Sequence, residues 1–336
     1  MNRTSTYQPA LAWFAAIGAA WVFVLVMLGA FTTSIGAGMI FPDWPLSNGS
    51  LNPEGWLSDL AKFAEHSHRL SAAVMSTVAI VLAVWLWRTE ERSWLRRLGW
   101  AAVALVLFQA LVGGLRVLLD RQQVAMVDTS VGRLFAMLHA GLAQIYVCAL
   151  FAIAAALSRS WVDGPAFGGG RRVRRLGVVC CLLLLAQLGI AAVMRHSFAG
   201  LAIPTFPLAP EGGLVPAFWN FKIGVHFAHR ALAVVLTVAL IWLAIAVWRD
   251  PLARFGQHLL AGLMLVLLST QLALGAMVIW TARNPFYTTA HVLVGALTLA
   301  ATFLLTWTAH RDELEIVRLR PVPAGDPAMQ HASVSA

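Results

Sequence analysis

Residues 64–70 read AEHSHRL and run directly into SAAVMSTVAIVLAVWLW at 71–87. The second stretch approaches the roughly 20 apolar residues that a helix needs to cross a bilayer. The first stretch places a Glu, two His and an Arg at the start of this apolar segment. Ionisable groups within a spanning segment are costly, so each of them is a candidate for function. The two stretches together predict a membrane-spanning helix with chemistry near one surface.

The rest of the chain has the same character. Of its 336 residues, 60% are hydrophobic and only 12% are charged, which is about half the charged fraction of a soluble domain. Backbone amides in lipid must be paired within their own segment, so long apolar runs predict helices. Eight such runs lie at roughly 10–32, 64–87, 97–119, 134–157, 176–195, 223–248, 256–280 and 288–309. We therefore expect an all-α integral membrane protein with eight transmembrane helices.

The charge pattern predicts the orientation of these helices. The net charge of +9 could by itself suggest nucleic-acid binding. The basic residues gather in short connections between the apolar runs, however, and membrane topology alone produces this pattern. These connections are 88–97, 168–175, 249–254 and 310–320, and the positive-inside rule places them and both termini in the cytoplasm. The longer loops at 33–63, 120–133, 196–222 and 281–287 then face outward. Three cysteines lie inside apolar runs and are expected to be free thiols: Cys148, Cys180 and Cys181.

Three motifs recur at a nearly constant spacing. FPDWPL at 41–46 returns as IPTFPL at 203–208, and Gln109 returns as Gln271. EHSHR at 65–69 returns as HFAHR at 226–230. This predicts two duplicated four-helix bundles related by a pseudo-twofold axis along the membrane normal. The expected units are residues 1–160, a basic linker at 161–175, residues 176–310, and a disordered cytoplasmic tail at 311–336.

Four histidines lie near the outer ends of alternate predicted helices: His68, His139, His229 and His291. Each half contributes two, which can converge within its own bundle. Two imidazoles facing each other among apolar helices suit the axial positions of a six-coordinate haem iron. A metal without a porphyrin usually needs more protein ligands than one such pair supplies. The simpler interpretation, that each His only bonds a neighbouring backbone group, fits a lone His better than four at equivalent places.

Other polar residues accompany these histidines. Glu65 and His226 each precede a candidate ligand by three residues and share its helix face. Glu65 is a candidate proton shuttle, although an ion pair with Arg69 would also explain it. Arg69 and Arg230 either pair with acidic groups of a cofactor, such as haem propionates, or extend to the outer interface. His66 and His196 lack a His at the equivalent position and rank lower.

At these residues the sequence resembles the haem A synthase family, which assembles cytochrome oxidase. The resemblance rests on Glu65-x-x-His68-Arg69, on HFAHR at 226–230, on His139 and His291, and on GAFTTSIGAGMIFPDWP at 29–45. It covers residues 10–309. It departs in the first outer loop, which lacks the cysteine pair of many bacterial members. It also departs at Thr32-Thr33, where a Thr-Arg pair is common in the family.

The resemblance implies an enzyme of the bacterial cytoplasmic (inner) membrane that oxidises the C8 methyl of haem O to a formyl group, giving haem A. By this analogy the second half holds a resident haem b on His229 and His291. The first half receives the substrate haem on His68 and His139, with Glu65 beside it. Its implied partners are haem O synthase, other cytochrome oxidase assembly factors and membrane lipid, with no nucleic acid.

Two other classes use the same histidines. A diheme electron-transfer protein of the cytochrome b type would need the four ligands but not Glu65. A transporter or haem-delivery protein would use intramembrane histidines for protons or cargo and would hold no bis-histidine haem. The sequence leaves the oligomeric state, the oxidant and the electron donor open.

Overall fold

The computed structural model describes residues 6–124, 129–164 and 168–315. In this part of the chain, eight helices are long and apolar enough to cross a membrane, which confirms the predicted fold class. They are α1 (Pro9–Ser34), α2 (Leu60–Thr89), α3 (Ser93–Leu118), α4 (Val131–Leu157), α6 (Arg171–His196), α7 (Phe221–Trp248), α8 (Phe255–Trp280) and α9 (Pro285–Ala309).

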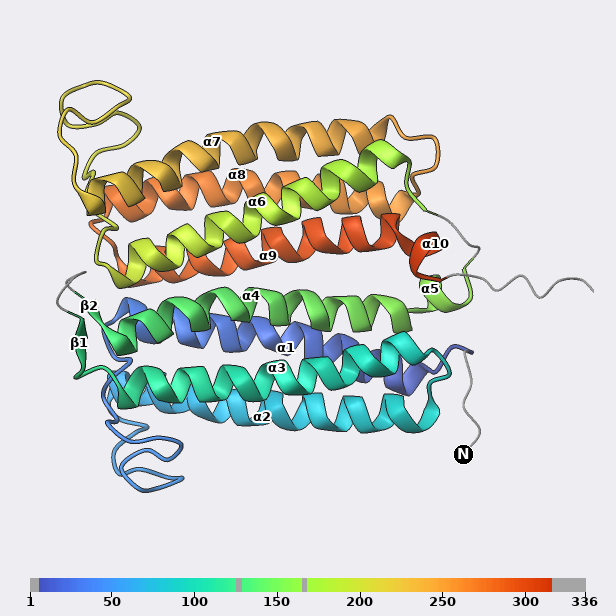
Figure 1. The fold of residues 1–336 in the computed structure, drawn as a ribbon, viewed down its shortest axis with the longest axis horizontal. Helices are drawn as coiled ribbons and strands as arrows, with labels where there is room; N and C mark the ends of the chain where they lie inside the picture. Colours follow the sequence, from blue (N-terminus) through green and yellow to red (C-terminus); the bar gives the residue numbers. More distant parts are fainter. Residues whose placement is uncertain (1–5, 125–128, 165–167, 316–336) are drawn as a thin grey trace, which may run out of the picture.

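Four short elements complete the described structure. Strands β1 (Gln123–Val124) and β2 (Thr129–Ser130) pair antiparallel between α3 and α4. Helices α5 (Arg159–Val162) and α10 (Arg311–Leu314) lie at the opposite, basic end of the molecule (Figure 1). The tail expected at 311–336 is described only as far as Glu315, which includes α10, and residues 316–336 lie outside the described residues.

The spanning helices lie roughly parallel in two groups, α1–α4 and α6–α9 (Figure 1). The groups meet where α9 packs on α1 and α4 and where α6 packs on α4. The two long outer loops, 35–59 and 197–220, project from the same end of the molecule. The duplication, its symmetry axis and the unit boundaries remain predictions.

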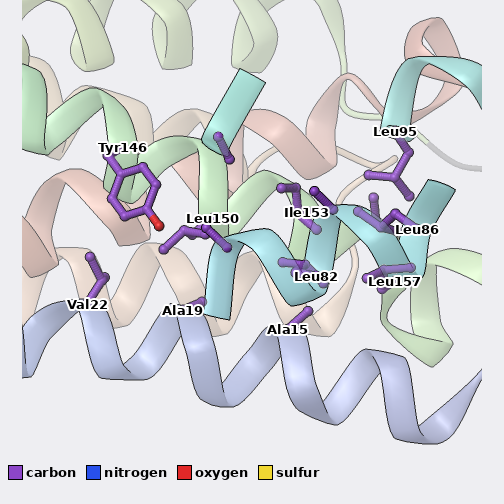
Figure 2. Close-up of a cluster of buried hydrophobic side chains, with 14 of the residues drawn as sticks. Ala15, Ala19, Val22, Leu82, Leu86, Leu95, Tyr146, Leu150, Ile153 and Leu157 are labelled. Atoms are coloured by element: carbon purple, nitrogen blue, oxygen red, sulfur yellow. The ribbon is translucent and has the colours of Figure 1, made fainter. Parts of the chain in front are cut away.

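Small and branched apolar side chains fill the first group. Ala15 and Ala19 on α1 allow α2 and α4 to approach closely, and larger side chains from those helices fill the space between them (Figure 2). The fully buried members include Leu11, Met75, Leu86, Leu95, Leu150 and Ile153. Packing of this kind, and not a hydrophobic effect in lipid, holds transmembrane helices together.

The four helices that carry the candidate ligands, His68, His139, His229 and His291, each begin with a side-chain N-cap. Asp59 caps α2, Ser130 caps α4 and Asn220 caps α7, and Asn284 accepts a bond from the Phe286 amide at the start of α9. Such caps satisfy amides that have no partner within the helix. By fixing where each helix begins, they also fix the depth of the histidine in its second or third turn.

Candidate functional site

The second pair of histidines faces across the α6–α9 group. The ring centroids of His229 on α7 and His291 on α9 are 6.4 Å apart, with the ring planes inclined by 64°. Two imidazoles bound to opposite sides of one metal, at about 2 Å for each bond, have centroids roughly 6 Å apart. The separation therefore accommodates one iron between the rings.

These two rings line a cavity of about 780 Å³. Its wall is apolar for most of its extent, and Val234 and Leu272, which are exposed on the outer surface of the group, take part in it. The polar residues at the wall include Gln187, Arg195, His226, Arg230, Gln271 and Arg283. A large apolar cavity with a few convergent polar groups is the usual form of a cofactor site.

Glutamine side chains from neighbouring helices contact the second pair. The Gln187 amide nitrogen donates to the His229 carbonyl at 3.0 Å and lies 3.4 Å from its Nε2. The Gln271 amide nitrogen lies 3.3 Å from Nε2 of His291. Nδ1 of both rings is buried without a hydrogen-bond partner among the described residues. Buried polar atoms are normally paired, so these nitrogens favour a ligand at the site.

In the first group, His68 on α2 and His139 on α4 are close enough to interact electrostatically. Nδ1 of His139 lies 3.1 Å from the Gln109 carbonyl, to which it donates, and the Gln109 amide donates to the His139 carbonyl at 3.0 Å. A donating Nδ1 leaves Nε2 unprotonated, which is the form that binds a metal. Nδ1 of His68 is buried and unpaired among the described residues.

Glycines lie beneath three of the four rings. A Cβ at Gly29 would lie 2.7 Å from Cε1 of His68, and one at Gly113 would lie 3.2 Å from Cε1 of His139. Gly275 is in the same position beneath His291, also at 3.2 Å. Each imidazole thus lies directly against the backbone of the neighbouring helix, in space that a methyl group would occupy.

Glu65 is buried and fully hydrogen-bonded, with a relative exposure of 4%. Its Oε2 accepts from the backbone amides of Ile40 at 2.8 Å and Phe41 at 3.2 Å, and its Oε1 accepts from Arg69 at 2.6 Å. The ion pair with Arg69 that the sequence left as an alternative is therefore present. The carboxylate also attaches the first outer loop to α2.

His226 occupies the same position in the second group. The Ile203 amide, in the second outer loop, points at its Nδ1 at 3.2 Å, and Nε of Arg230 points at its Nε2 at 3.3 Å. A neutral imidazole accepts through only one nitrogen, so it can satisfy one of these donors at a time. The carboxylate of Glu65 accepts from equivalent donors through both oxygens.

The arginines that follow the candidate ligands bind loop backbone. Arg69 donates to the carbonyls of Phe41 at 3.1 Å and Asp43 at 2.7 Å, and Arg230 donates to those of Ile203 at 3.0 Å and Thr205 at 2.6 Å. Each thus joins its outer loop to its helix. This geometry is that of a structural support for the loop, in place of pairing with a cofactor or extension to the outer interface.

The two lower-ranked histidines have distinct surroundings. Nδ1 of His66 lies 3.0 Å from the Ser47 hydroxyl, and its ring packs edge-on against Trp56 at 4.8 Å between centroids. It therefore belongs to the packing of the first outer loop. His196, at the end of α6, interacts electrostatically with His139 of the other group, which the sequence analysis missed.

Sequence reasoning also missed two arginines near the histidine pairs. Arg116 on α3 interacts electrostatically with Glu65, His68 and His139. Arg195 on α6 lines the cavity that holds the second pair. Neither recurs at the repeat spacing, since position 278 is Val and position 33 is Thr. Only their charge within a spanning segment could have drawn attention to them.

The donor set fits haem better than a bare metal ion. Within residues 6–124, 129–164 and 168–315, no group of three or more His, Cys, Asp or Glu residues is placed to hold a metal. Two imidazoles alone suffice when a porphyrin supplies the other four nitrogens. The cavity, the ring separation and the unpaired nitrogens all agree with that arrangement.

Comparison with known proteins identifies the family of this chain. The family model described as cytochrome oxidase assembly protein (COX15-CtaA) matches residues 12–304. The chain belongs to this family. It is 29% identical to a heme A synthase of Geobacillus kaustophilus over 96% of this chain and 98% of that protein. It is 27% identical to a heme A synthase of Listeria monocytogenes, over 88% of this chain and 94% of the relative.

Membership of the family agrees with the resemblance seen in the sequence. The matched range includes both histidine pairs and Glu65. A heme A synthase of Alkalihalophilus pseudofirmus is 24% identical over 86% of this chain and 95% of that protein. The similarity therefore extends over both helix groups and both outer loops.

Proposed function

We propose that this protein is a haem A synthase, which oxidises the C8 methyl group of haem O to a formyl group. The observation that carries the proposal is a difference between two otherwise equivalent sites. Each has a pair of histidines and an arginine-anchored loop, but only the first has a carboxylate, Glu65, where the second has His226. Such an enzyme needs one site where the substrate reacts and a neighbouring site that holds a redox cofactor.

In this proposal His229 and His291 are the axial ligands of a resident haem b. The unpaired Nδ1 atoms, the 6.4 Å ring separation and the apolar cavity support this assignment. A bound haem b would supply one-electron redox chemistry there. Gln187 holds the backbone carbonyl of His229, and Gln271 lies against the ring of His291.

The substrate haem O is assigned to His68 and His139. His139 is oriented by the Gln109 carbonyl, so that its Nε2 is available to the substrate iron. Written with water as the oxygen source, oxidation of a methyl to a formyl group releases four protons and passes four electrons to an external oxidant. Protons must therefore leave a site that apolar helices surround.

Glu65 is the residue assigned to that proton transfer. It is the acidic side chain nearest in sequence to a substrate ligand, and it lies one turn before His68 on α2. Its hydrogen bonds to Arg69 and to the loop amides hold the carboxylate at a fixed position. Proton transfer through a positioned carboxylate typically contributes about 10²–10⁴-fold to a rate.

We further infer that the protein lies in the bacterial cytoplasmic membrane with both termini inside, and that haem O synthase and other assembly factors of cytochrome oxidase are its partners. The clustering of basic residues at the end with α5 and α10 supports this orientation. The haem sites then lie near the outer face.

The proposal is tested by production of the protein together with haem O synthase in cells that lack their own haem A synthase. Extraction of membrane haem followed by mass analysis should reveal haem A. Haem O alone, in membranes that contain the folded protein, would contradict the proposal. A diheme electron-transfer protein would give that second result while still showing a bis-histidine absorption spectrum.

A further inference from the structure

The cavity of the second histidine pair carries only positive charge at its wall. Arg195, Arg230 and Arg283 line it, and no Asp or Glu is among its lining residues in the described structure. The Arg230 guanidinium already donates to the loop carbonyls of Ile203 and Thr205. Arg195 and Arg283 are therefore the cations left to face the cavity.

Arg195 is held in place, and no ion pair neutralises it within the part of the chain that the structure describes. Its Nη2 donates to the Ala30 carbonyl at 2.7 Å and to the Ser34 hydroxyl at 2.8 Å, both on α1 of the other group. Arg283 is close enough to interact with it electrostatically, and both carry the same sign. Two cations beside an apolar cavity are unfavourable unless an anion joins them.

Arg116 is the corresponding cation of the first pair. A Cβ added at Gly38 in the first outer loop would meet its guanidinium, and the charges of Glu65 and Asp120 act on it. Gly200, at the equivalent place in the second loop, contacts Arg283. Each site therefore has an arginine beside a glycine of its outer loop, and these two glycines are equivalent in the repeat. The two arginines are not at equivalent positions.

The two cationic sites meet between the helix groups. Arg195 interacts electrostatically with Arg116, and His196 interacts with both of them and with His139. α6, which carries Arg195 and His196, packs against α4, which carries His139. We call Arg116, Arg195, His196 and Arg283 the junction cluster.

We propose that the junction cluster binds the carboxylates of both haems, with Arg116 taking those of the substrate and Arg195 with Arg283 taking those of the resident haem. This inference rests on the proposed function. A guanidinium matches a carboxylate with two parallel hydrogen bonds. A porphyrin with acidic side chains would bring an apolar body, an iron and carboxylates to each site, and the described lining of the second cavity has no carboxylate of its own.

The inference reassigns the propionate role considered for Arg69 and Arg230. Those two residues anchor the loops, while the junction cluster recognises the ligand acid groups. The carboxylates of both haems would then be held by arginines near the boundary between the helix groups, where Arg195 already bonds to α1.

Iron protoporphyrin IX and its dimethyl ester, which lacks both negative charges, test the inference. Purified protein that retains its resident haem is titrated with each compound, and absorbance reports binding at the first site. We expect the free acid to bind about ten- to a hundredfold more tightly than the ester. Arg116→Gln should bring this ratio close to one, and Arg116→Lys should restore part of it.

Arg121→Gln is the matched control, because Arg121 is an exposed arginine just beyond the same helix. It should keep the wild-type ratio. An Arg116→Gln protein that still prefers the free acid as strongly as wild type would overturn the inference, as would loss of the preference in Arg121→Gln.

The second site is tested in a His68→Ala background, produced without haem and titrated with the same two compounds. Arg195→Gln and Arg283→Gln should each reduce the preference for the free acid, whereas Arg195→Lys should keep most of it. If Arg195→Gln does not fold, Arg283→Gln decides the result. Unchanged ratios in every folded Gln variant would overturn the inference while leaving haem A synthesis intact. Failure of the wild type to bind both the free acid and the ester would instead overturn the proposed function.

Discussion

Glu65 and Arg69 form an ion pair of 2.6 Å across one turn of α2, and both side chains hold the backbone of the first outer loop at the same time. The first outer loop is thereby attached to the helix that carries His68. In the second group, His226 and Arg230 make the equivalent attachment without a carboxylate.

Replacement of Glu65 separates its chemical role from its structural role. Glu65→Gln keeps an oxygen that can accept from the loop amides but removes the charge. We expect conversion of haem O to fall by about 10²-fold or more, with haem content unchanged, as measured by haem extraction and absorbance. The control is Arg69→Leu, which removes the other half of the attachment. If both variants lose activity and the first outer loop becomes disordered in both, the role of Glu65 is only to attach that loop to α2.

The histidine pairs should differ in the haem that they hold. His229→Ala and His291→Ala are expected to lose the resident haem, because one imidazole is left without its partner across the iron. His68→Ala and His139→Ala should keep the resident haem and abolish conversion. Quantification of haem in the four purified proteins checks this assignment. His258→Ala is the control, because His258 lies at the end of α8 away from the histidine pair, and it should behave as wild type. Equal haem loss in all four ligand variants would refute the assignment.

The glycines beneath the rings set the space available to the ligands. A methyl group at Gly29 would lie 2.7 Å from Cε1 of His68, so Gly29→Ala must displace the ring or helix α1. Overpacking of this kind costs about 1–3 kcal/mol. We therefore expect weaker binding of haem at the first site and reduced conversion, measured by titration and by product analysis. Gly141→Ala on α4 meets no atom within 4 Å and should leave both unchanged.

Asp43 should make the first outer loop sensitive to acid. Burial acts to raise its pKa, but hydrogen bonds from the Gly49 and Asn48 amides, with the charge of Arg69, outweigh burial and hold the pKa below its ordinary value of 3.8. A depressed pKa contributes stability that is present above the ordinary pKa and is lost as the pH falls through the lower one. Hydrogen exchange of the loop amides should therefore accelerate below about pH 4.

Asp43→Asn is the control for this loop prediction, since the amide keeps an acceptor but does not titrate in this range. Its exchange rates should show no such acceleration. Equal acid sensitivity in the variant and in the wild type would assign the effect to another group.

The spanning helices were predictable because their signal is local. Each apolar run must satisfy its own backbone within lipid, so hydropathy alone located all eight of them. The pairing of His229 with His291 was also within reach, because both begin helices that run in the same direction within one half. Gln109 and Gln271 could be recognised as a repeated pair, but the sequence did not indicate that they contact the histidines.

The helix boundaries and the loop attachments were harder to predict. Asp59 and Asn220 begin their helices several residues before the apolar runs, because capping depends on side chains outside the hydrophobic stretch. The sequence suggested an ion pair for Glu65 but could not provide the amides of Ile40 and Phe41, which reach it only when the loop folds back onto α2.

The sequence by itself therefore determined a membrane protein of eight helices with two histidine pairs near one surface, since hydropathy and repeat spacing are properties of each segment. Only the tertiary structure decided which charges lie beside those histidines. Arg116 and Arg195 come from different helices in the two halves, and no sequence repeat connects them. Their charges interact because α4 packs against both α3, which carries Arg116, and α6, which carries Arg195, and the packing of one helix on another is not encoded in either segment alone.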